Sequence, residues 1–138
     1  MTRLVVVVDD SSVSLSIMRK HLTKLLPEDF ILILACPNST IDVVRLNEVA
    51  IIFTDLYFLK SREARINLEG IEMIQIIRSY EQDSSIDPIP IVAFSVDQGK
   101  RAAALQAGAS WFMEKPISID DLRRVLEAFH IIDTHTTT

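Results

Sequence analysis

The stretch "LVVVVDDSS", residues 4–12, runs from five consecutive apolar side chains directly into two adjacent carboxylates, Asp9 and Asp10. A continuous apolar run that lacks alternating polar residues predicts a strand buried on both faces. After it, apolar side chains recur at three- and four-residue spacing from Val13 through Ile17 to Leu25, which predicts a helix with an apolar stripe. The stretch therefore predicts a β-α unit with two acids at the carboxyl end of its strand.

The same alternation continues to the end of the chain. Further apolar runs predict strands at residues 30–35, 49–55, 88–95 and 109–114. Helical character predicts helices at residues 12–26, 39–46, 70–82, 98–108 and 118–129. Gly108 is the expected C-cap of one helix, and Ser118 with Asp121 has the spacing of a capping box. Five apolar strands, each followed by a helix, predict an α/β fold, a doubly wound five-stranded parallel sheet with helices on both faces.

Length and composition favour one domain. The chain has 138 residues, three glycines and five scattered prolines, and no stretch resembles a linker or an internal repeat. We expect the domain to span residues 1–130 and residues 131–138 to form a disordered tail. The lone cysteine, Cys36, is expected to be a small buried hydrophobe.

Charge and hydropathy argue against two classes of partner. A formal charge of -5, with no run of more than two basic residues, argues against direct binding of nucleic acid. The apolar run at residues 4–8 is too short for a signal peptide or a membrane span. We therefore expect a cytoplasmic protein that does not insert into membranes.

Chemically active side chains stand at the ends of the predicted strands. Asp9 and Asp10 end the first strand, Asp55 the third and Ser95 the fourth, and Lys115 follows the fifth. The carboxyl ends of parallel strands meet at one edge of the sheet, so we expect these side chains to converge there. With so few glycines, neither a phosphate-binding loop nor a dinucleotide fingerprint is possible.

Clustered carboxylates require a partner. Two of them about 4 Å apart repel by roughly 4 kcal/mol at an effective dielectric constant near 20, so they recruit a cation or a proton. Oxygen-only ligands open to water favour Mg²⁺. A carboxylate beside Mg²⁺, faced by an ammonium and a hydroxyl, can attack phosphorus. A simpler interpretation is that these residues only cap the next helices, as Asp10 or Ser11 could; the combination of all five favours phosphoryl transfer.

Five motifs, "VVVVDDSS", "IIFTDLY", "EGIEMI", "IVAFS" and "AGASWFMEKPI", occur in this order from Arg3 to about Phe129. Together they resemble the receiver domain of the two-component response-regulator family, in the form of a chemotaxis-regulator-like single-domain receiver. The resemblance implies a flavodoxin-like sheet with strand order 2-1-3-4-5. It also implies a signal-transduction phosphoprotein that is no enzyme beyond its own phosphorylation and dephosphorylation.

The resemblance assigns a phosphoacceptor and a metal site. Asp55 would accept a phosphoryl group from a sensor histidine kinase or a histidine phosphotransfer protein of a phosphorelay. Asp10 and Asp55 would bind Mg²⁺ directly, with Mn²⁺ as a possible substitute. The backbone carbonyl of Tyr57 would be the third protein ligand, and Asp9 would contribute through water.

It also implies a conformational switch. Lys115 and Ser95 would contact the phosphoryl group, and Ser95 would leave a space into which Phe112 rotates. The peptide bond that precedes Pro116 is expected to be cis. A downstream effector protein would read the face formed by the helix at 98–108, the strand at 109–114 and the helix at 118–129. Dimerisation through the last two helices is common in the family, so a homodimer is possible.

The chain departs from the family after the phosphoacceptor. The segment 56–69, "LYFLKSREARINLE", is about twice as long as is usual, and it carries Lys60, Arg62 and Arg65. We interpret it as a solvated loop; contact with a kinase, a partner or the phosphoryl donor is the alternative. By analogy with family positions, Tyr57 and Asp97 would tune dephosphorylation.

Three alternatives remain. The chain could be a receiver-like protein-binding module that acts without phosphorylation, or a fragment of a larger regulator or hybrid kinase. It could also be a phosphatase or phosphotransferase of the haloacid dehalogenase superfamily. That superfamily requires an acid two residues after its nucleophile, where this chain has Tyr57.

Overall fold

A computed structural model describes residues 3–35, 48–57 and 70–134 of the chain. Five parallel strands form one sheet in the order β2-β1-β3-β4-β5, which confirms the predicted fold. The strands are β1 (Arg3–Val8), β2 (Phe30–Ala35), β3 (Val49–Asp55), β4 (Ile91–Ser95) and β5 (Trp111–Glu114). The helices are α1 (Ser12–Leu25), α4 (Gly70–Ser84), α5 (Arg101–Ala107) and α6 (Ile119–Ala128), with a 3-10 turn, η2 (Gln98–Lys100), before α5.

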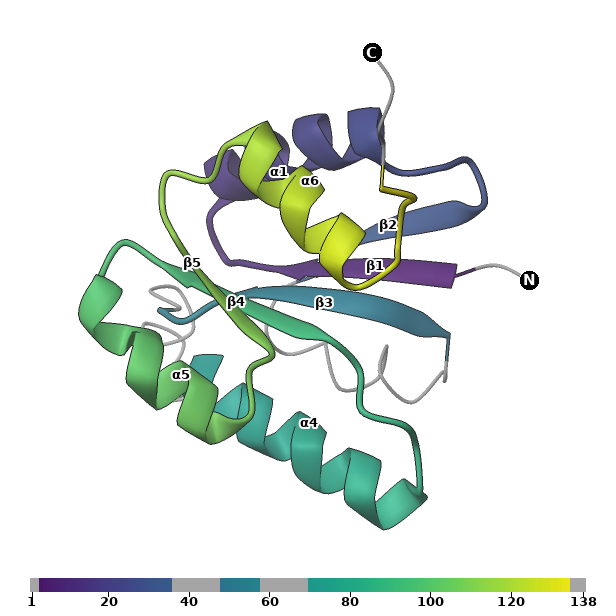
Figure 1. The fold of residues 1–138 in the computed structure, drawn as a ribbon. Helices are drawn as coiled ribbons and strands as arrows, with labels where there is room; N and C mark the ends of the chain where they lie inside the picture. Colours follow the sequence, from purple (N-terminus) through teal and green to yellow (C-terminus); the bar gives the residue numbers. More distant parts are fainter. Residues whose placement is uncertain (1–2, 36–47, 58–69, 135–138) are drawn as a thin grey trace.

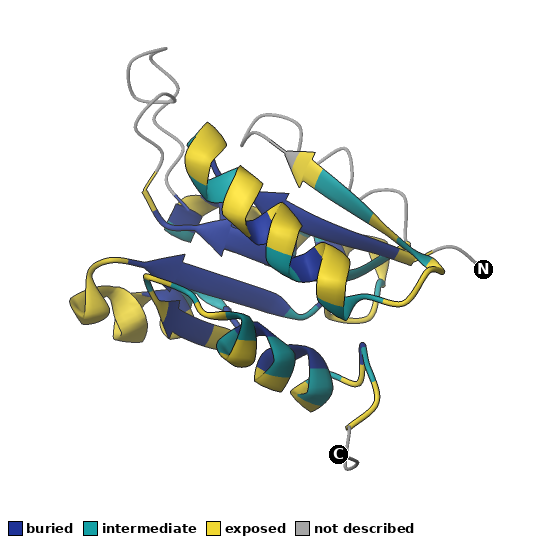
Figure 2. Ribbon diagram, turned by 90° about the horizontal axis from the view of Figure 1, so that it is seen from above, coloured by how far each residue is buried: buried dark blue, intermediate teal, exposed yellow. Residues whose placement is uncertain are grey.

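The sheet is covered on both faces, as Figure 1 shows: α1 and α6 lie on one face, and α4 and α5 lie on the other. Strand β1 explains this arrangement, because all of Val5–Val8 are completely buried. Val6 and Val8 pack in the cluster that includes Met73 and Ile77 of α4. Val5 and Val7 pack in the opposite cluster, with residues of α1 and α6. Figure 2 shows the buried strands between helices whose outer surfaces are exposed.

Local signals fix the ends of the helices. The Ser11 hydroxyl caps α1 by accepting from the N–H of Ser14 at 3.3 Å. Gly108 ends α5 with φ of 119°, a backbone conformation that favours glycine. Ser118 and Asp121 form the predicted capping box at the start of α6. No helix in the described part of the chain is both long and apolar enough to span a bilayer.

Two strands are shorter than predicted. Strand β4 begins at Ile91 rather than residue 88, because Pro88 and Pro90 have no backbone N–H to donate to a neighbouring strand. Strand β5 begins at Trp111 rather than residue 109, because the N–H of Ala109 donates instead to the last turn of α5, at the carbonyl of Ala104 (3.0 Å). The predicted helix 39–46, Cys36 and residues 58–69 lie outside the described residues.

Two expectations from the sequence need correction. The disordered tail was predicted to begin at residue 131, but Ile131 is buried and its N–H donates to the carbonyl of Leu126 at 2.8 Å. The apolar stripe of α1 is also wider than its buried face. Met18 and Leu22 are buried, whereas Val13 and Ile17 are 69% and 47% exposed. These two side chains therefore lie at the surface, near the carboxyl end of the sheet.

Candidate functional site

Three of the predicted side chains meet at the carboxyl edge of the sheet. The ammonium nitrogen of Lys115 lies 3.5 Å from Asp9 Oδ2 and 3.4 Å from Asp55 Oδ2. Asp9 is 1% exposed and Asp55 is 8% exposed. The ammonium also lies 5.1 Å from the centre of the Phe94 ring. The site is thus a nearly buried pair of carboxylates joined by one cation.

The backbone orients both acids. Asp9 Oδ1 accepts from the N–H of Ser11, and Asp55 Oδ1 accepts from the N–H of Leu56, both at 2.9 Å. These bonds hold one oxygen of each carboxylate at its own loop and direct both Oδ2 atoms toward Lys115. The site therefore has a fixed geometry before any ligand enters.

The electrostatic balance at Asp55 favours an additional positive charge. Burial, together with the neighbouring Asp9 carboxylate, raises the pKa of Asp55 from 3.8 to about 6. Lys115 and a hydrogen bond with the Tyr57 backbone act in the opposite direction but do not cancel the increase in pKa. A carboxylate whose ionised form is disfavoured gains from a bound cation.

The donor set fits Mg²⁺ only with help from other oxygens. In the described ranges, no group of three or more His, Cys, Asp or Glu side chains is placed to hold a metal ion. Asp10 is half-buried beside Asp9. Mg²⁺ is usually held by one or two carboxylates and keeps several waters, so backbone carbonyls and water can complete the shell. The residues present fit that kind of site and not an all-carboxylate cage.

Ser95 and Asp97 form a turn at the end of β4. Ser95 is buried, and its hydroxyl oxygen accepts from the N–H of Asp97 at 3.1 Å. Asp97 Oδ1 in turn accepts from the N–H of Gly99 at 2.9 Å and caps η2. The carboxylate of Asp97 thus has a structural partner that the sequence prediction did not include.

The aromatic side chains of β5 face opposite ways. Phe112 is buried in the cluster on the α4 and α5 side. Trp111 is 39% exposed and packs edge-on against Phe129, with ring centres 6.0 Å apart. The bond between Lys115 and Pro116 is cis, as the resemblance implied. Tyr57 is 43% exposed beside the site.

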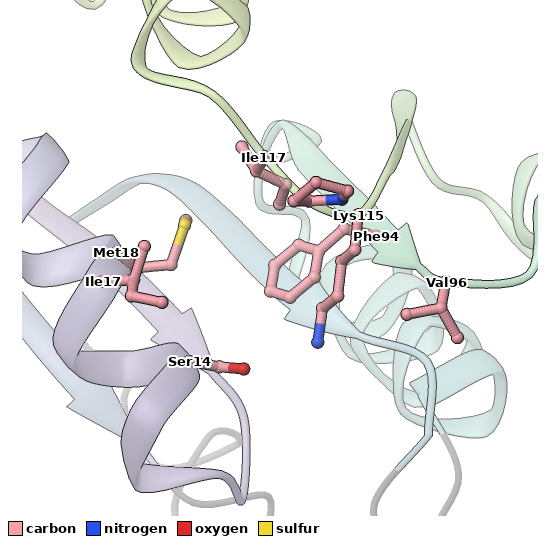
Figure 3. Close-up of a pocket in the computed structure, with 8 residues that line it drawn as sticks. Ser14, Ile17, Met18, Phe94, Val96, Lys115 and Ile117 are labelled. Atoms are coloured by element: carbon pink, nitrogen blue, oxygen red, sulfur yellow. The ribbon is translucent and has the colours of Figure 1, made fainter.

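An apolar groove of about 340 Å³ adjoins the carboxylates and was not predicted. It is lined by Ser14, Ile17, Met18, Phe94, Val96, Lys115, Pro116 and Ile117. Figure 3 shows the side chains from α1 on one side, with Phe94, Lys115 and Ile117 facing them. Two features of the sequence could have indicated this groove: the wide apolar stripe of α1, which includes Ile17, and the apolar residue Val96 directly after β4. In the structure both side chains are exposed, Val96 by 76%.

A second hollow, of about 630 Å³, lies beside Ser95 and Val96 at the ends of β3 and β4. Its lining residues are Leu56, Tyr57, Ile71, Glu72, Ser95, Val96, Asp97 and Lys100. Val96 lines both hollows, so the two meet at this exposed side chain.

Comparison with known proteins adds a family match. The family model described as "Response regulator receiver domain" matches residues 5–127. No curated protein sequence matches the chain.

Solved structures share the fold. A chain from the co-crystal structure of the Saccharomyces cerevisiae histidine phosphotransfer protein Ypd1 with the receiver domain of Ssk1 is 22% identical; the match covers 93% of this chain and 88% of that chain, with a TM-score of 0.76. Vibrio cholerae chemotaxis protein CheY4 is 17% identical, over 94% of this chain and 99% of that chain, with a TM-score of 0.71. The receiver domain of the Pseudomonas aeruginosa sensor histidine kinase PA1611, solved with magnesium in its active-site cleft, is 24% identical, over 94% and 98% of the chains, with a TM-score of 0.67.

Proposed function

Because the chain belongs to the family of response regulator receiver domains, we propose that Asp55 accepts a phosphoryl group from a histidine kinase or a histidine phosphotransfer protein. The reaction would depend on Mg²⁺, and the phosphorylated domain would signal to a protein partner. One observation carries this proposal: the Lys115 ammonium lies between the Asp9 and Asp55 carboxylates at the open edge of the sheet. An ammonium beside the accepting carboxylate can stabilise the negative charge on the transferred phosphoryl oxygens, which is most of what phosphoryl transfer asks of a protein.

The residues divide the chemistry among them. An oxygen of the Asp55 carboxylate forms a bond to phosphorus as the phosphorus–nitrogen bond to the donor histidine breaks, and the imidazole nitrogen keeps that electron pair. Lys115 would follow the transferred phosphoryl oxygens, and the Ser95 hydroxyl would donate to one of them. The domain would then catalyse only its own phosphorylation and dephosphorylation.

The proposed metal ligands are the Asp10 and Asp55 carboxylates and the Tyr57 backbone carbonyl, with Asp9 acting through water. Bound Mg²⁺ would offset the negative charge of the carboxylates and of the phosphoryl oxygens. The raised pKa of Asp55 supports this part of the proposal, because burial and the neighbouring Asp9 carboxylate together disfavour the ionised form by more than Lys115 restores, and a bound cation would favour that form.

The surface near Asp55 suits a protein donor. The apolar groove lined by Lys115 lies between α1 and the end of β4, next to the 8%-exposed Asp55. Ile17 and Val96 are exposed apolar side chains that line this groove, and Val13 is an exposed apolar residue one turn before Ile17 on α1. Exposed apolar groups gathered beside a reactive centre favour contact with another macromolecule. The yeast relative was solved together with a histidine phosphotransfer protein, which is consistent with such a donor.

The signal would leave on the face made by α5, β5 and α6. Ser95 moves toward the phosphoryl group, and Phe112, now buried, takes up the space released. Phosphorylation shifts the population only if the phosphoryl group interacts better with one conformation than with the other. The new contacts of Ser95 and Lys115 would supply that difference.

The test is direct modification of the full chain. Acetyl phosphate with Mg²⁺ should add one phosphoryl group to the intact protein, measured by mass spectrometry, and the Asp55→Asn variant should stay unmodified. Modification should also fail when the metal is chelated. An unmodified wild-type protein, with native spectra and a binding partner still captured, would instead support a module that acts without phosphorylation.

A further inference from the structure

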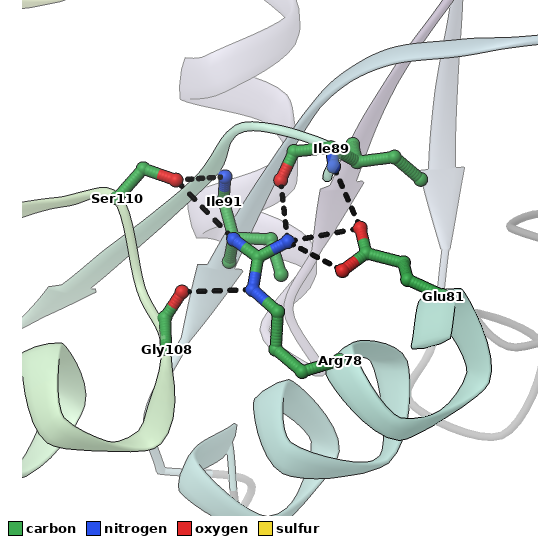
Figure 4. A network of polar contacts seen from close by, with 6 residues as sticks. All are labelled: Arg78, Glu81, Ile89, Ile91, Gly108 and Ser110. Atoms are coloured by element: carbon green, nitrogen blue, oxygen red, sulfur yellow. Dashed lines mark hydrogen bonds and ion pairs between the residues drawn. The ribbon is translucent and has the colours of Figure 1, made fainter. Parts of the chain in front are cut away.

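A second polar cluster lies at the opposite end of β4 from Asp55, and Figure 4 shows its contacts. Arg78 of α4 donates through Nε to the carbonyl of Gly108 at 2.9 Å and through Nη1 to the carbonyl of Ile89 at 2.9 Å. Nη1 also contacts both Glu81 carboxylate oxygens at 2.8 and 2.9 Å, and Nη2 reaches Ser110 Oγ at 3.3 Å. One guanidinium thus joins α4, the start of β4 and the α5–β5 junction.

Glu81 makes this cluster strong. The carboxylate is nearly buried, with a side-chain exposure of 4%, and its Oε2 accepts from the N–H of Ile89 at 2.6 Å. Hydrogen bonds with ionised partners are about twice as strong as neutral ones. Removal of one partner leaves a buried charge unpaired, so the cluster resists opening.

The cluster fixes the C-terminal end of α5. Gly108 caps that helix, and its carbonyl is the group that accepts from Arg78 Nε. Space is also limited there, because a Cβ at Gly108 would lie 2.8 Å from Arg78 Cγ. The end of α5 is therefore held by a charged donor in a closely packed setting.

The N-terminal end of α5 is held differently. One neutral hydrogen bond, from the N–H of Asp97 to Ser95 Oγ at 3.1 Å, connects Ser95 with the turn that leads into α5. Asp97 then accepts from Gly99 through Oδ1 (2.9 Å) and from Lys100 through its carbonyl (3.1 Å). Residues 96–100 are all exposed. A change at Ser95 thus reaches the turn before α5 through a single neutral hydrogen bond in an exposed segment, whereas the other end of α5 is held by the Arg78–Glu81 ion pair.

We propose that Arg78 and Glu81 form an anchor on which α5 pivots at Gly108, so that phosphorylation displaces the N-terminal end of α5 and leaves its C-terminal end in place. The inference rests on the proposed function, because the turn of Ser95 toward a phosphoryl group breaks its bond with Asp97. Arg78 acts as a positioning residue in this scheme. It determines which part of the α5–β5–α6 face changes for a partner.

The test uses nuclear magnetic resonance on the full chain, with beryllofluoride and Mg²⁺ as the phosphoryl analogue. In the wild-type protein, amide shift changes at Asp97–Lys100 should exceed those at Ala107–Ser110 several-fold. Equal changes at both ends of α5 would overturn the pivot while leaving phosphorylation intact. Absence of change anywhere in the spectrum would overturn the proposed function, and the pivot with it.

Two variants test the anchor without the analogue. Arg78→Met keeps the apolar stem and Glu81→Gln keeps an acceptor, and each should speed amide exchange at Ile89 by about tenfold or more, as expected for loss of a charged hydrogen bond. With beryllofluoride, shift changes in either variant should extend to Ala107–Ser110. Arg123→Gln is the matched control, because it removes an exposed (i, i+3) ion pair with Asp120. Shift changes in both anchor variants that stay confined to Asp97–Lys100 would refute the proposal.

Discussion

The Lys115 ammonium and Asp55 Oδ2 are 3.4 Å apart, and Asp9 Oδ2 lies at almost the same distance from that ammonium. This single cation holds together two acids that arrive from β1 and β3. Its charge does not offset the effects of burial and of the Asp9 carboxylate, which together raise the pKa of Asp55 to about 6. The pH dependence of stability, the binding of metal and the reactivity of Asp55 should all depend on this balance of charge.

The pH dependence of stability should reveal that ionisation of Asp55 is unfavourable in the native protein. Its pKa is 3.8 in the unfolded chain and about 6 in the native protein, so the native state binds this proton more tightly. The contribution of this group to stability is therefore greatest below pH 4 and is lost as pH rises to about 6. Without metal, Asp55→Asn should stabilise the protein by about 1 to 3 kcal/mol at pH 7 and have little effect near pH 4. Denaturant unfolding at both pH values measures this, and an equal effect at both would contradict it.

A bound metal ion should offset the unfavourable ionisation of Asp55. Mg²⁺ or Mn²⁺ added at pH 7 should raise the melting temperature of the wild-type protein, because a ligand that binds only the native state stabilises it. The increase should disappear in Asp10→Asn and in Asp55→Asn. A control substitution of an exposed acid away from the site, Asp133→Asn, should leave the increase unchanged. An undiminished increase in the Asp10 and Asp55 variants would place the metal elsewhere.

Loss of the Lys115 ammonium should have two separate effects. In Lys115→Met the pKa of Asp55 should rise above about 6, because the ammonium is one of the groups that lower it. Phosphorylation by acetyl phosphate should slow by about a hundredfold or more, since a charge partner of the transferred group is gone. Carboxyl titration by nuclear magnetic resonance and intact-mass kinetics measure the two effects. A wild-type rate in this variant would remove Lys115 from the chemistry.

Gly70 should be intolerant of any side chain. A Cβ at this position would lie 2.6 Å from Leu56 Cα and even closer to the Asp55 carbonyl oxygen, and neither backbone atom can move without shifting the site. Gly70→Ala should cost about 1 to 3 kcal/mol or more and slow the phosphorylation of Asp55. Gly99→Ala is the control, since its Cβ would meet only the Asp97 carboxylate at 3.0 Å. Similar unfolding free energies for the two variants would argue against this close approach of α4 to β3.

The apolar groove should matter for a protein donor and not for a small one. Ile17→Ser should slow transfer from a phosphorylated histidine protein by about fivefold to tenfold, as expected for loss of one interface side chain. Its rate with acetyl phosphate should not change. Ile76→Ser removes a similarly exposed isoleucine from α4 and is the matched control. A loss of rate with both donors would indicate a structural effect of the Ile17 substitution.

The sequence predicted those features that depend on local pattern. The apolar run of β1 and the polar residues at strand ends predict both the sheet and the meeting of Asp9, Asp55 and Lys115, because strand direction alone brings these ends together. Burial on α1 was harder to predict, since Val13 and Ile17 continue the apolar stripe but lie beyond the surface that the sheet covers.

The anchor could not be predicted from pattern. Arg78 and Glu81 have the same three-residue separation as Arg123 and Asp120, a spacing typical of solvated helix pairs. What distinguishes Arg78 is the carbonyl groups of Ile89 and Gly108, which only the tertiary fold brings within reach. The role of Asp97 as the cap of η2 likewise depends on a turn geometry that the family analogy did not convey.

The central claim is that Asp55 accepts a phosphoryl group from a histidine protein, and phosphotransfer profiling tests it most directly. Each histidine kinase and phosphotransfer protein of the source organism would be labelled with radioactive phosphate and mixed briefly with this chain in Mg²⁺. We expect one donor to label the wild-type chain much faster than the others do, and no donor to label Asp55→Ala. Absence of labelling by every donor, or equal labelling of Asp55→Ala, would contradict the claim.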